Sequence, residues 1–284
     1  MIKNIQWKAI KNPMQIKQSG DLVYLDFPLY APFGDRLLAA FSTRLGGVSQ
    51  GYLGAMNLSF TRGDDPAAVR KNYRIIGRAL GFDPKDIVAS QQTHTTNVRV
   101  VTEADRGCGY ARPLPYTDVD GMITNVPGLV LATFYADCVP VYFYDPQKGA
   151  IGLSHSGWKG TVGKISKETI RAMTANYGTE PADLYVAIGP SICQDCYEVS
   201  EDVIQQFQAA FSPDQQKELY YKKENGKYQL NLQKAIFFTL VEAGVSPDRI
   251  ALPGICTCCN PDFLFSHRAS KGKRGNLAAF MSLR

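Results

Sequence analysis

The chain has 284 residues, of which 45% are hydrophobic and 20% charged, so its core is large enough to need neither disulfides nor a structural metal. Its net charge of +5 is spread thinly, without a dense basic arm, and nucleic-acid binding is not expected. No apolar run is long enough for a membrane span and no signal peptide is evident, so we expect a cytoplasmic protein whose cysteines are thiols.

Taken in chain order, the first third of the sequence predicts short strands around one helix. Strands are expected at 21–30, 37–43, 87–89 and 98–101. Asp65 and Pro66 suit the N-cap and the first turn of a helix. The apolar residues of this helix recur every three or four positions as far as Leu80, and Gly81 is expected to end it.

The middle of the chain is rich in strands of nearly continuous apolar character, which is typical of strands buried on both faces. Strands are expected at 121–124, 129–136, 139–144, 150–155, 184–188 and 277–283. Helices are expected at about 163–177, 201–211 and 232–243. Because the strands outnumber the helices and do not alternate strictly with them, we predict a single α+β domain built on a mixed, double-layered sheet.

Three potential metal ligands lie beside the ends of predicted strands. His94 lies in QQTH, Cys138 in ADCVPV and His155 in HSGWKGT. Such tight connections are where a rigid scaffold presents reactive groups. Two imidazoles and one thiolate suit Zn²⁺, and three protein ligands leave a fourth position for water or substrate. The spacing is unlike that of a zinc finger, so a catalytic site fits these residues better than a structural one.

Other interpretations of the same residues stay open. Each residue taken singly is also an ordinary core or surface group. In a metal-free hydrolase or deamidase, Cys138 is a nucleophile activated by His155, with Asp137 or another polar group orienting the ring. That hypothesis competes with the metal site because thiolate ligation blocks the nucleophile. A third hypothesis is a metal-binding protein without turnover.

Two Gly-rich turns and a C-terminal loop carry basic residues. Arg44 in segment 42–49 and Lys159 in segment 157–161 are each able to hold an anion, although both segments are also plain turns. The basic loop at 265–274 either binds a substrate anion or is a solvated surface.

Five further cysteines form two groups. Cys193 and Cys196 have C-x₂-C spacing, and Cys256, Cys258 and Cys259 follow sixty residues later. A second zinc site is conceivable, but we do not find a matching pattern in the second group and expect incidental thiols.

Seven segments in register resemble the YfiH-like family, which is described as multicopper polyphenol oxidase or laccase domain, and also as purine nucleoside phosphorylase. They are TRLGGVS, QQTH, DGMIT, ADCVPV, HSGWKGT, IGPSIC-x₃-YEV and CTCCNPDFLFSHR, and the match spans about 36–284. The resemblance implies one catalytic domain over 1–284, an α+β fold in which mixed sheets form a central β-sandwich flanked by helices, related to toxin deamidases. The tail SHR-x₅-R departs from a more usual SYRR-type run, which leaves Arg268 and Arg274 unmatched.

The resemblance also implies a site and an activity. One zinc ion, or copper in its place, is expected at His94, Cys138 and His155. The implied activity is phosphate-dependent cleavage of adenosine, inosine, guanosine and methylthioadenosine, with adenosine deamination alongside. The positions expected to contact substrate are Arg44, Asn57, Gln92 and Lys159.

The chemistry of these activities limits the choice of residues. With three histidines in total, the chain is unable to build a trinuclear copper cluster, so phenol oxidation by one copper is expected only as a side activity. The H-x-E and P-C-x-x-C segments of familiar zinc deaminases are absent, which leaves Asp137 as the nearest candidate for proton transfer beside the catalytic Cys138 and His155. Arg44 and Lys159 are the expected phosphate ligands. The sequence does not indicate an oligomeric state.

Overall fold

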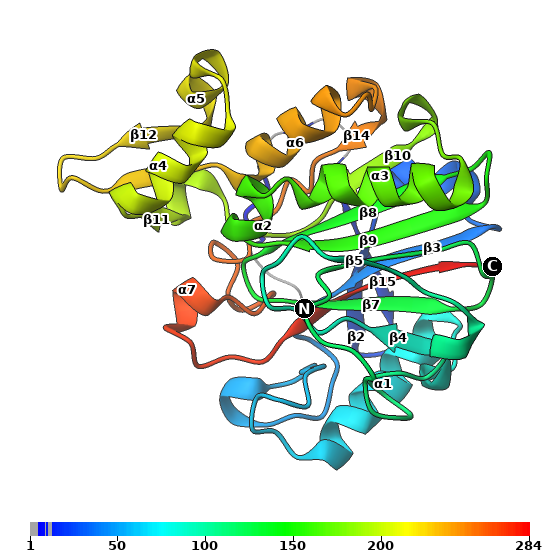
Figure 1. Cartoon of the computed structure of the whole chain (residues 1–284). Helices are drawn as coiled ribbons and strands as arrows, with labels where there is room; N and C mark the ends of the chain where they lie inside the picture. The colour runs from blue at the N-terminus through cyan, green and yellow to red at the C-terminus, as the bar shows by residue number, and fades with distance from the viewer. Residues whose placement is uncertain (1–4, 9, 11–12) are drawn as a thin grey trace.

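The computed structural model describes residues 5–8, 10 and 13–284 of the chain. Within these residues, two larger β-sheets pack against each other and a smaller sheet stands to one side (Figure 1). The first sheet has the order β1 (Gln15–Ser19), β2 (Leu22–Asp26), β3 (Leu37–Ser42), β15 (Leu277–Leu283), β7 (Val130–Tyr135) and β4 (Ile87–Ala89). The second has the order β14 (Ile250–Ala251), β10 (Tyr185–Ile188), β8 (Val139–Asp145), β9 (Ala150–Ser156), β6 (Gly121–Thr124) and β5 (Val98–Val100). The smaller sheet contains β11 (Glu198–Val199), β13 (Tyr228–Leu230) and β12 (Tyr220–Lys222).

Both larger sheets are mixed. The central strands run antiparallel, as in the β8–β9 and β15–β3 pairs. Strands β4, β5 and β14 each pair in parallel with β7, β6 and β10 respectively. The chain therefore leaves and re-enters each sheet through long connections, and these connections carry most of the polar residues described below.

Alternation along the central strands places side chains in two cores at once. Successive side chains of a strand point to opposite faces of a sheet. On β8, Tyr142 and Tyr144 point into the sandwich core between the sheets, whereas Val141 and Phe143 point to the outer face, which helices cover. On β15, Phe280 similarly points outward beneath another helix. This two-sided burial explains the nearly continuous apolar sequence of these strands.

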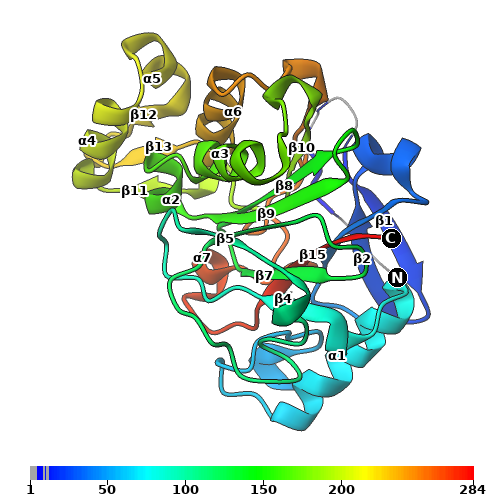
Figure 2. The same cartoon turned by 45° about the vertical axis from the view of Figure 1, so that its right-hand side comes forward.

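Helices cover the outer face of each sheet. The helix α1 (Pro66–Leu80) packs on the first sheet through residues such as Tyr73; Asp65 caps its N-terminus, and Gly81 ends it with a left-handed φ of 77°. On the second sheet, α3 lies against β9 and β6, and α4 and α6 join the same apolar cluster (Figure 2). These helices are α3 (Ile165–Tyr177), α4 (Glu201–Ala210) and α6 (Leu232–Glu242). None of the helices in the described residues has both the length and the apolar character needed to cross a membrane.

The predicted α+β class, with a β-sandwich flanked by helices, is confirmed. The prediction of one strand over 21–30 is wrong, because β2 ends at Asp26 and Pro28 begins a 3₁₀ helix (Pro28–Phe33). Proline lacks the N–H that a strand ladder needs, so the segment turns at this point. The sequence also missed β1, β14, the smaller sheet and three short helices, whose lengths are too small to show periodicity. These helices are α2 (Trp158–Val162), α5 (Pro213–Leu219) and α7 (His267–Ser270).

A hydrogen bond across the sandwich provides a test of this packing. The buried hydroxyl of Tyr142 on β8 donates to the carbonyl oxygen of Ala40 on β3, 2.9 Å away. Tyr142→Phe removes the donor with little change in volume, and we expect the free energy of unfolding to fall by about 1 kcal/mol in urea titrations. The exposed Tyr221→Phe is the control and is expected to change it by less than about 0.5 kcal/mol. Equal effects would contradict the cross-sheet role of the Tyr142 hydroxyl.

Candidate active site

The three predicted metal ligands converge at one edge of the sandwich. His94 lies in the connection after β4, Cys138 in the turn between β7 and β8, and His155 on β9. The Cys138 Sγ lies 3.8 Å from the His94 Nε2, and the two imidazole rings are 4.9 Å apart at their centroids. One ligand atom from each residue lies within 4.8 Å of the other two. The three side chains are therefore close enough to share one ion.

The backbone at this edge adopts conformations that ordinary residues avoid. His94 has a φ of 67° and Asp137, directly before Cys138, has a φ of 93°. Both lie in the left-handed region, where a side chain crowds its own backbone, so the surrounding contacts must hold these residues in place. Gly157 is also required here, because a Cβ at this position would lie 2.5 Å from the His94 Cδ2 and 3.2 Å from the Cys138 Sγ.

Asp120 organises two of the three ligands. Its buried carboxylate accepts hydrogen bonds from the backbone N–H groups of Thr93, His94 and Thr95 at 2.9–3.1 Å, and it contacts the His155 Nδ1 at 2.7 Å. Burial alone would raise the pKa of Asp120, but the bonds and charge from His155 and these N–H groups outweigh burial and hold the pKa at about 2. A carboxylate on Nδ1 leaves the His155 Nε2 for a metal, as in carboxylate–histidine–zinc arrangements.

Asp120 was missed by sequence reasoning. Its position in a family motif could have pointed to it, because Asp120 begins the DGMIT segment and directly precedes Gly121 at the start of β6. Nothing in the sequence indicated that this carboxylate would reach both the connection after β4 and His155 on β9.

The electrostatics of the site favour a thiolate. Burial raises the pKa of Cys138, but the charge of His155 and hydrogen bonds from His155 and His94 lower it to about 6. Burial lowers the pKa of His155, whereas the Cys138 thiolate and Asp120 raise it to about 9. Cys138 is therefore ready to bind a metal or to act as a nucleophile. The donor set of two imidazoles and a thiolate, the Gly157 contact and the Asp120–His155 pair together fit a zinc-class ion.

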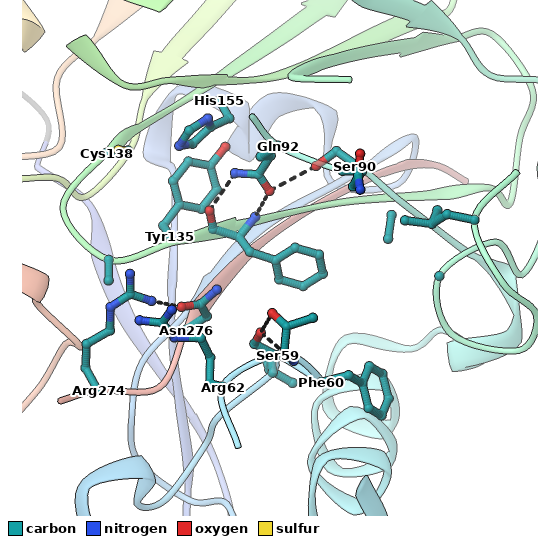
Figure 3. A pocket seen from close by; sticks show the side chains of 18 of the residues that line it. Ser59, Phe60, Arg62, Ser90, Gln92, Tyr135, Cys138, His155, Arg274 and Asn276 are labelled. Carbon is teal, nitrogen blue, oxygen red and sulfur yellow. Dashed lines mark hydrogen bonds between the residues drawn. The ribbon is translucent and has the colours of Figure 1, made fainter. Parts of the chain in front are cut away.

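A cavity of about 400 Å³ adjoins this site (Figure 3). His94, Cys138 and His155 line one part of it, and Arg62 and Arg274 line another, as the close-up shows for the labelled residues. Its apolar walls include Leu58, Phe60, Tyr73, Leu114, Phe134 and Tyr135. A mostly apolar cavity of this size with a few convergent polar groups is typical of a small-molecule site.

The two arginines bring positive charge to the cavity. No carboxylate among the described residues forms a salt bridge with Arg62 or Arg274. The Arg274 Nε is buried and lacks a hydrogen-bond partner within the described part of the chain. Burial, and secondarily the charge of Arg62, lower the pKa of Arg274 to about 10. An anion placed between these side chains would satisfy both the charge and the free donor.

Of the residues expected to contact substrate, Gln92 lines the cavity. Its side-chain amide donates to the carbonyl oxygen of Phe134 and accepts from the Phe134 N–H, both at 2.7 Å, and it also accepts from the Ser90 hydroxyl. Figure 3 shows this network at the cavity wall. The amide plane is thereby fixed beside the aromatic wall.

Arg44 and Lys159 do not line the cavity. The Arg44 guanidinium donates to the carbonyl oxygens of Gly54 and Pro261 and lies over the Phe265 ring, so it ties loops together. Lys159 is exposed on α2. The sequence does not single out Arg62, and it places Arg274 in a basic loop that either binds a substrate anion or is a solvated surface. The fold brings the two arginines together at the cavity.

Asn57 and Asp137 occupy supporting positions. Asn57 is fully buried, and its Oδ1 accepts from the N–H of the cavity-lining Asn276 at 2.9 Å. Asp137 accepts from the Thr257 hydroxyl at 2.6 Å and from the Arg268 N–H at 2.7 Å. Both carboxylate oxygens of Asp137 thus accept hydrogen bonds, and these bonds hold the turn that carries Cys138.

Similar proteins share both the sequence and the fold. The chain is 34% identical over 276 residues to "Purine nucleoside phosphorylase YlmD" of Bacillus subtilis, covering 96% of this chain and 98% of that protein. It is 34% identical over 232 residues to "Adenosine deaminase RL5" of an unknown prokaryotic organism, covering 81% and 87%. The crystal structure of the Bacillus licheniformis hypothetical protein YfiH superposes with a TM-score of 0.88 at 31% identity, covering 95% of this chain and 99% of that one.

The family model described as "Multi-copper polyphenol oxidoreductase laccase" matches residues 38–284, nearly the whole range over which the sequence motifs lie. The chain belongs to this family.

Proposed function

We propose that the chain is a zinc-dependent purine nucleoside phosphorylase that also deaminates adenosine. The observation that carries this proposal is a single cavity lined both by a His–Cys–His trio and by two arginines that have no carboxylate partner among the described residues. The names of the similar proteins support the same reactions. The expected nucleosides are adenosine, inosine, guanosine and methylthioadenosine.

His94, Cys138 and His155 would hold the metal. When bound, zinc supplies a Lewis acid that stabilises developing negative charge and activates water at neutral pH. Asp120 keeps the Nδ1 of His155 engaged and fixes the connection that carries His94. The cavity wall beside Gln92, Phe134 and Phe60 offers an apolar surface and a fixed amide for a purine.

Arg62 and Arg274 are the proposed phosphate ligands, in place of Arg44 and Lys159. In phosphorolysis, a phosphate oxygen forms a bond to C1′ of the ribose while the bond from C1′ to the purine N9 breaks. The electron pair of that bond leaves with the purine, which then takes up a proton. Two guanidinium groups would hold the phosphate by charge-assisted hydrogen bonds and fix its approach to C1′.

The laccase description fits the site poorly. A multicopper oxidase needs several coppers, held mainly by imidazoles. Among the described residues, histidine occurs in one group of potential metal ligands, that of His94, Cys138 and His155. The third histidine of the chain, His267, lies outside this group. One copper in place of zinc would support at most a slow oxidation of phenols, which we propose as a side activity.

A metal-free mechanism is the second candidate. Cys138, His155 and Asp120 lie in the order of a nucleophile, a base and an orienting carboxylate, and the lowered pKa of Cys138 favours a thiolate. Asp120 takes the role that the sequence suggested for Asp137.

Removal of the metal separates these two candidates. We expect chelator-treated protein to lose phosphorolysis and deamination of adenosine, and added Zn²⁺ to restore both, measured by separation of adenine, inosine and ribose 1-phosphate. Zinc is also expected to protect Cys138 from alkylation, as followed by peptide mass spectrometry. Full activity in metal-free protein that alkylation of Cys138 then abolishes would instead support the nucleophile.

Arg62→Gln and Arg274→Gln test the phosphate site. Because a hydrogen bond to a charged group contributes about 1.5–3 kcal/mol, we expect each change to raise the KM for phosphate about 10- to 100-fold. Deamination of adenosine, which uses no phosphate, is expected to change less than about threefold. Lys273→Gln removes the same charge from an exposed neighbour and is the matched control. If Lys159→Gln raises the KM for phosphate and the arginine variants do not, the proposed assignment is wrong.

Asp120→Asn tests the support of the ligands. We expect it to weaken metal binding about 10- to 100-fold in competition with a chelator, because the amide no longer accepts equally from His155 and the three N–H groups. Asp118→Asn is the control: Asp118 lies two residues away, is exposed, and contacts Thr93 but none of the three ligands. Equal losses in both variants would argue against a specific role for Asp120.

A further inference from the structure

Four cysteines outside the active site meet at one point of the structure. Cys193 and Cys196 lie at a 3₁₀ turn after β10, and Cys256 and Cys259 lie in the connection after β14. One Sγ from each lies within 4.8 Å of the other three. All four are free thiols, and Cys193 and Cys256 are buried.

The distances between the sulfurs fit a tetrathiolate metal site. The Cys259 Sγ lies 3.5 Å from the Cys196 Sγ and 3.9 Å from the Cys193 Sγ. Zn–S bonds in a tetrahedral site set neighbouring sulfurs about 3.8 Å apart. The backbone N–H groups of Cys193 and Cys259 both point to the Cys256 Sγ, at 3.2 Å and 3.4 Å. Such donors stabilise the negative charge of a thiolate ligand.

The sequence pattern agrees with this geometry, and the expectation of incidental thiols overlooked it. Cys256 and Cys259 have the same C-x₂-C spacing as Cys193 and Cys196. The intervening Cys258 obscured the pattern, and it lies outside the group of four. Paired C-x₂-C motifs are a strong indication of a zinc site.

We propose that Cys193, Cys196, Cys256 and Cys259 bind one zinc ion as a second metal site, which is structural. Four protein ligands complete a tetrahedral shell and leave no open position for substrate. The Lys8 ammonium pairs with Asp195 at 2.9 Å and acts electrostatically on Cys193, so a cation lies beside the excess negative charge of four thiolates. This site does not depend on the nucleoside chemistry proposed above.

The site would connect two loops that hold the active-site turn. Thr257 donates its hydroxyl to Asp137 and its N–H to the carbonyl oxygen of Ser191. The N–H of Ile192 donates to the carbonyl oxygen of Asp137 at 3.0 Å. Asp137 therefore bonds to a neighbour of each cysteine pair, and Cys138 follows it directly. A metal that fixes both pairs would fix the backbone of the Cys138 turn.

Metal analysis of the full chain, purified under reducing conditions and loaded with Zn²⁺, tests the proposal. We expect two zinc ions per chain in the wild type and one in the double variant Cys196→Ser, Cys259→Ser. The control Cys258→Ser removes an adjacent thiol and is expected to keep two. A wild type with one zinc that Cys138→Ala abolishes would overturn the second site, and so would a double variant that keeps two.

Cobalt substitution keeps the test decisive if the double variant does not fold. Cys138→Ala leaves the four cysteines intact, and its Co²⁺ form is expected to show the intense thiolate-to-metal absorption of a tetrathiolate. Absence of this absorption in folded Cys138→Ala protein would overturn the proposal. A disulfide within the four cysteines in protein that was never exposed to oxidant, found by mass spectrometry, would overturn it as well.

Discussion

The site depends on the carboxylate of Asp120. It is buried at the start of β6, where an isolated charge would be costly, and it is stabilised by three consecutive N–H groups and by His155. These bonds hold the connection around His94, whose φ is left-handed, and position His155 so that one ring nitrogen of each histidine lies within 4.8 Å of the Cys138 Sγ. One buried charge thus connects β6, β9 and the loop after β4.

The sandwich explains why this edge is available for chemistry. The central strands satisfy their backbone groups within the sheets and bury both of their faces, so they form a rigid frame. The polar residues gather where strands end and long connections cross. The cavity collects side chains from several such connections, so that the three candidate metal ligands and the two arginines line the same space.

Two groups of residues in the site favour ligands of opposite charge, one a cation and the other an anion. The thiolate and the imidazoles suit a cation, whereas Arg62 and Arg274 suit an anion. A phosphorylase needs both, because it must stabilise a departing base and hold an attacking phosphate. The same metal ligands, with water in place of phosphate, suit deamination. Every residue that the proposed function requires therefore either lines the cavity or supports a residue that lines it.

Local sequence patterns were enough to predict the fold class and to pick out the candidate metal ligands. The apolar runs of β7, β8, β9 and β15 and the capped helix α1 are strong local patterns, and their predicted bounds differ from the structure by one residue at most at either end. His94, Cys138 and His155 were identified because histidine is rare in this chain and each residue lies beside a predicted strand. The sequence also contains two C-x₂-C pairs, but Cys258 lies inside the second pair and made its spacing easy to overlook.

Which polar residues reach the cavity depends on the tertiary fold. Arg44 and Lys159 fit the expected motifs, yet Arg44 bonds to loop carbonyls and Lys159 lies on the surface. Arg62 and Arg274 are more than 200 residues apart in sequence, and no local pattern links them, but both line one cavity in the fold. Asp120 lies in DGMIT and Asp137 in ADCVPV, and only their hydrogen-bond partners distinguish the two carboxylates. Such contacts join segments that are distant in sequence, and no local periodicity or spacing records them.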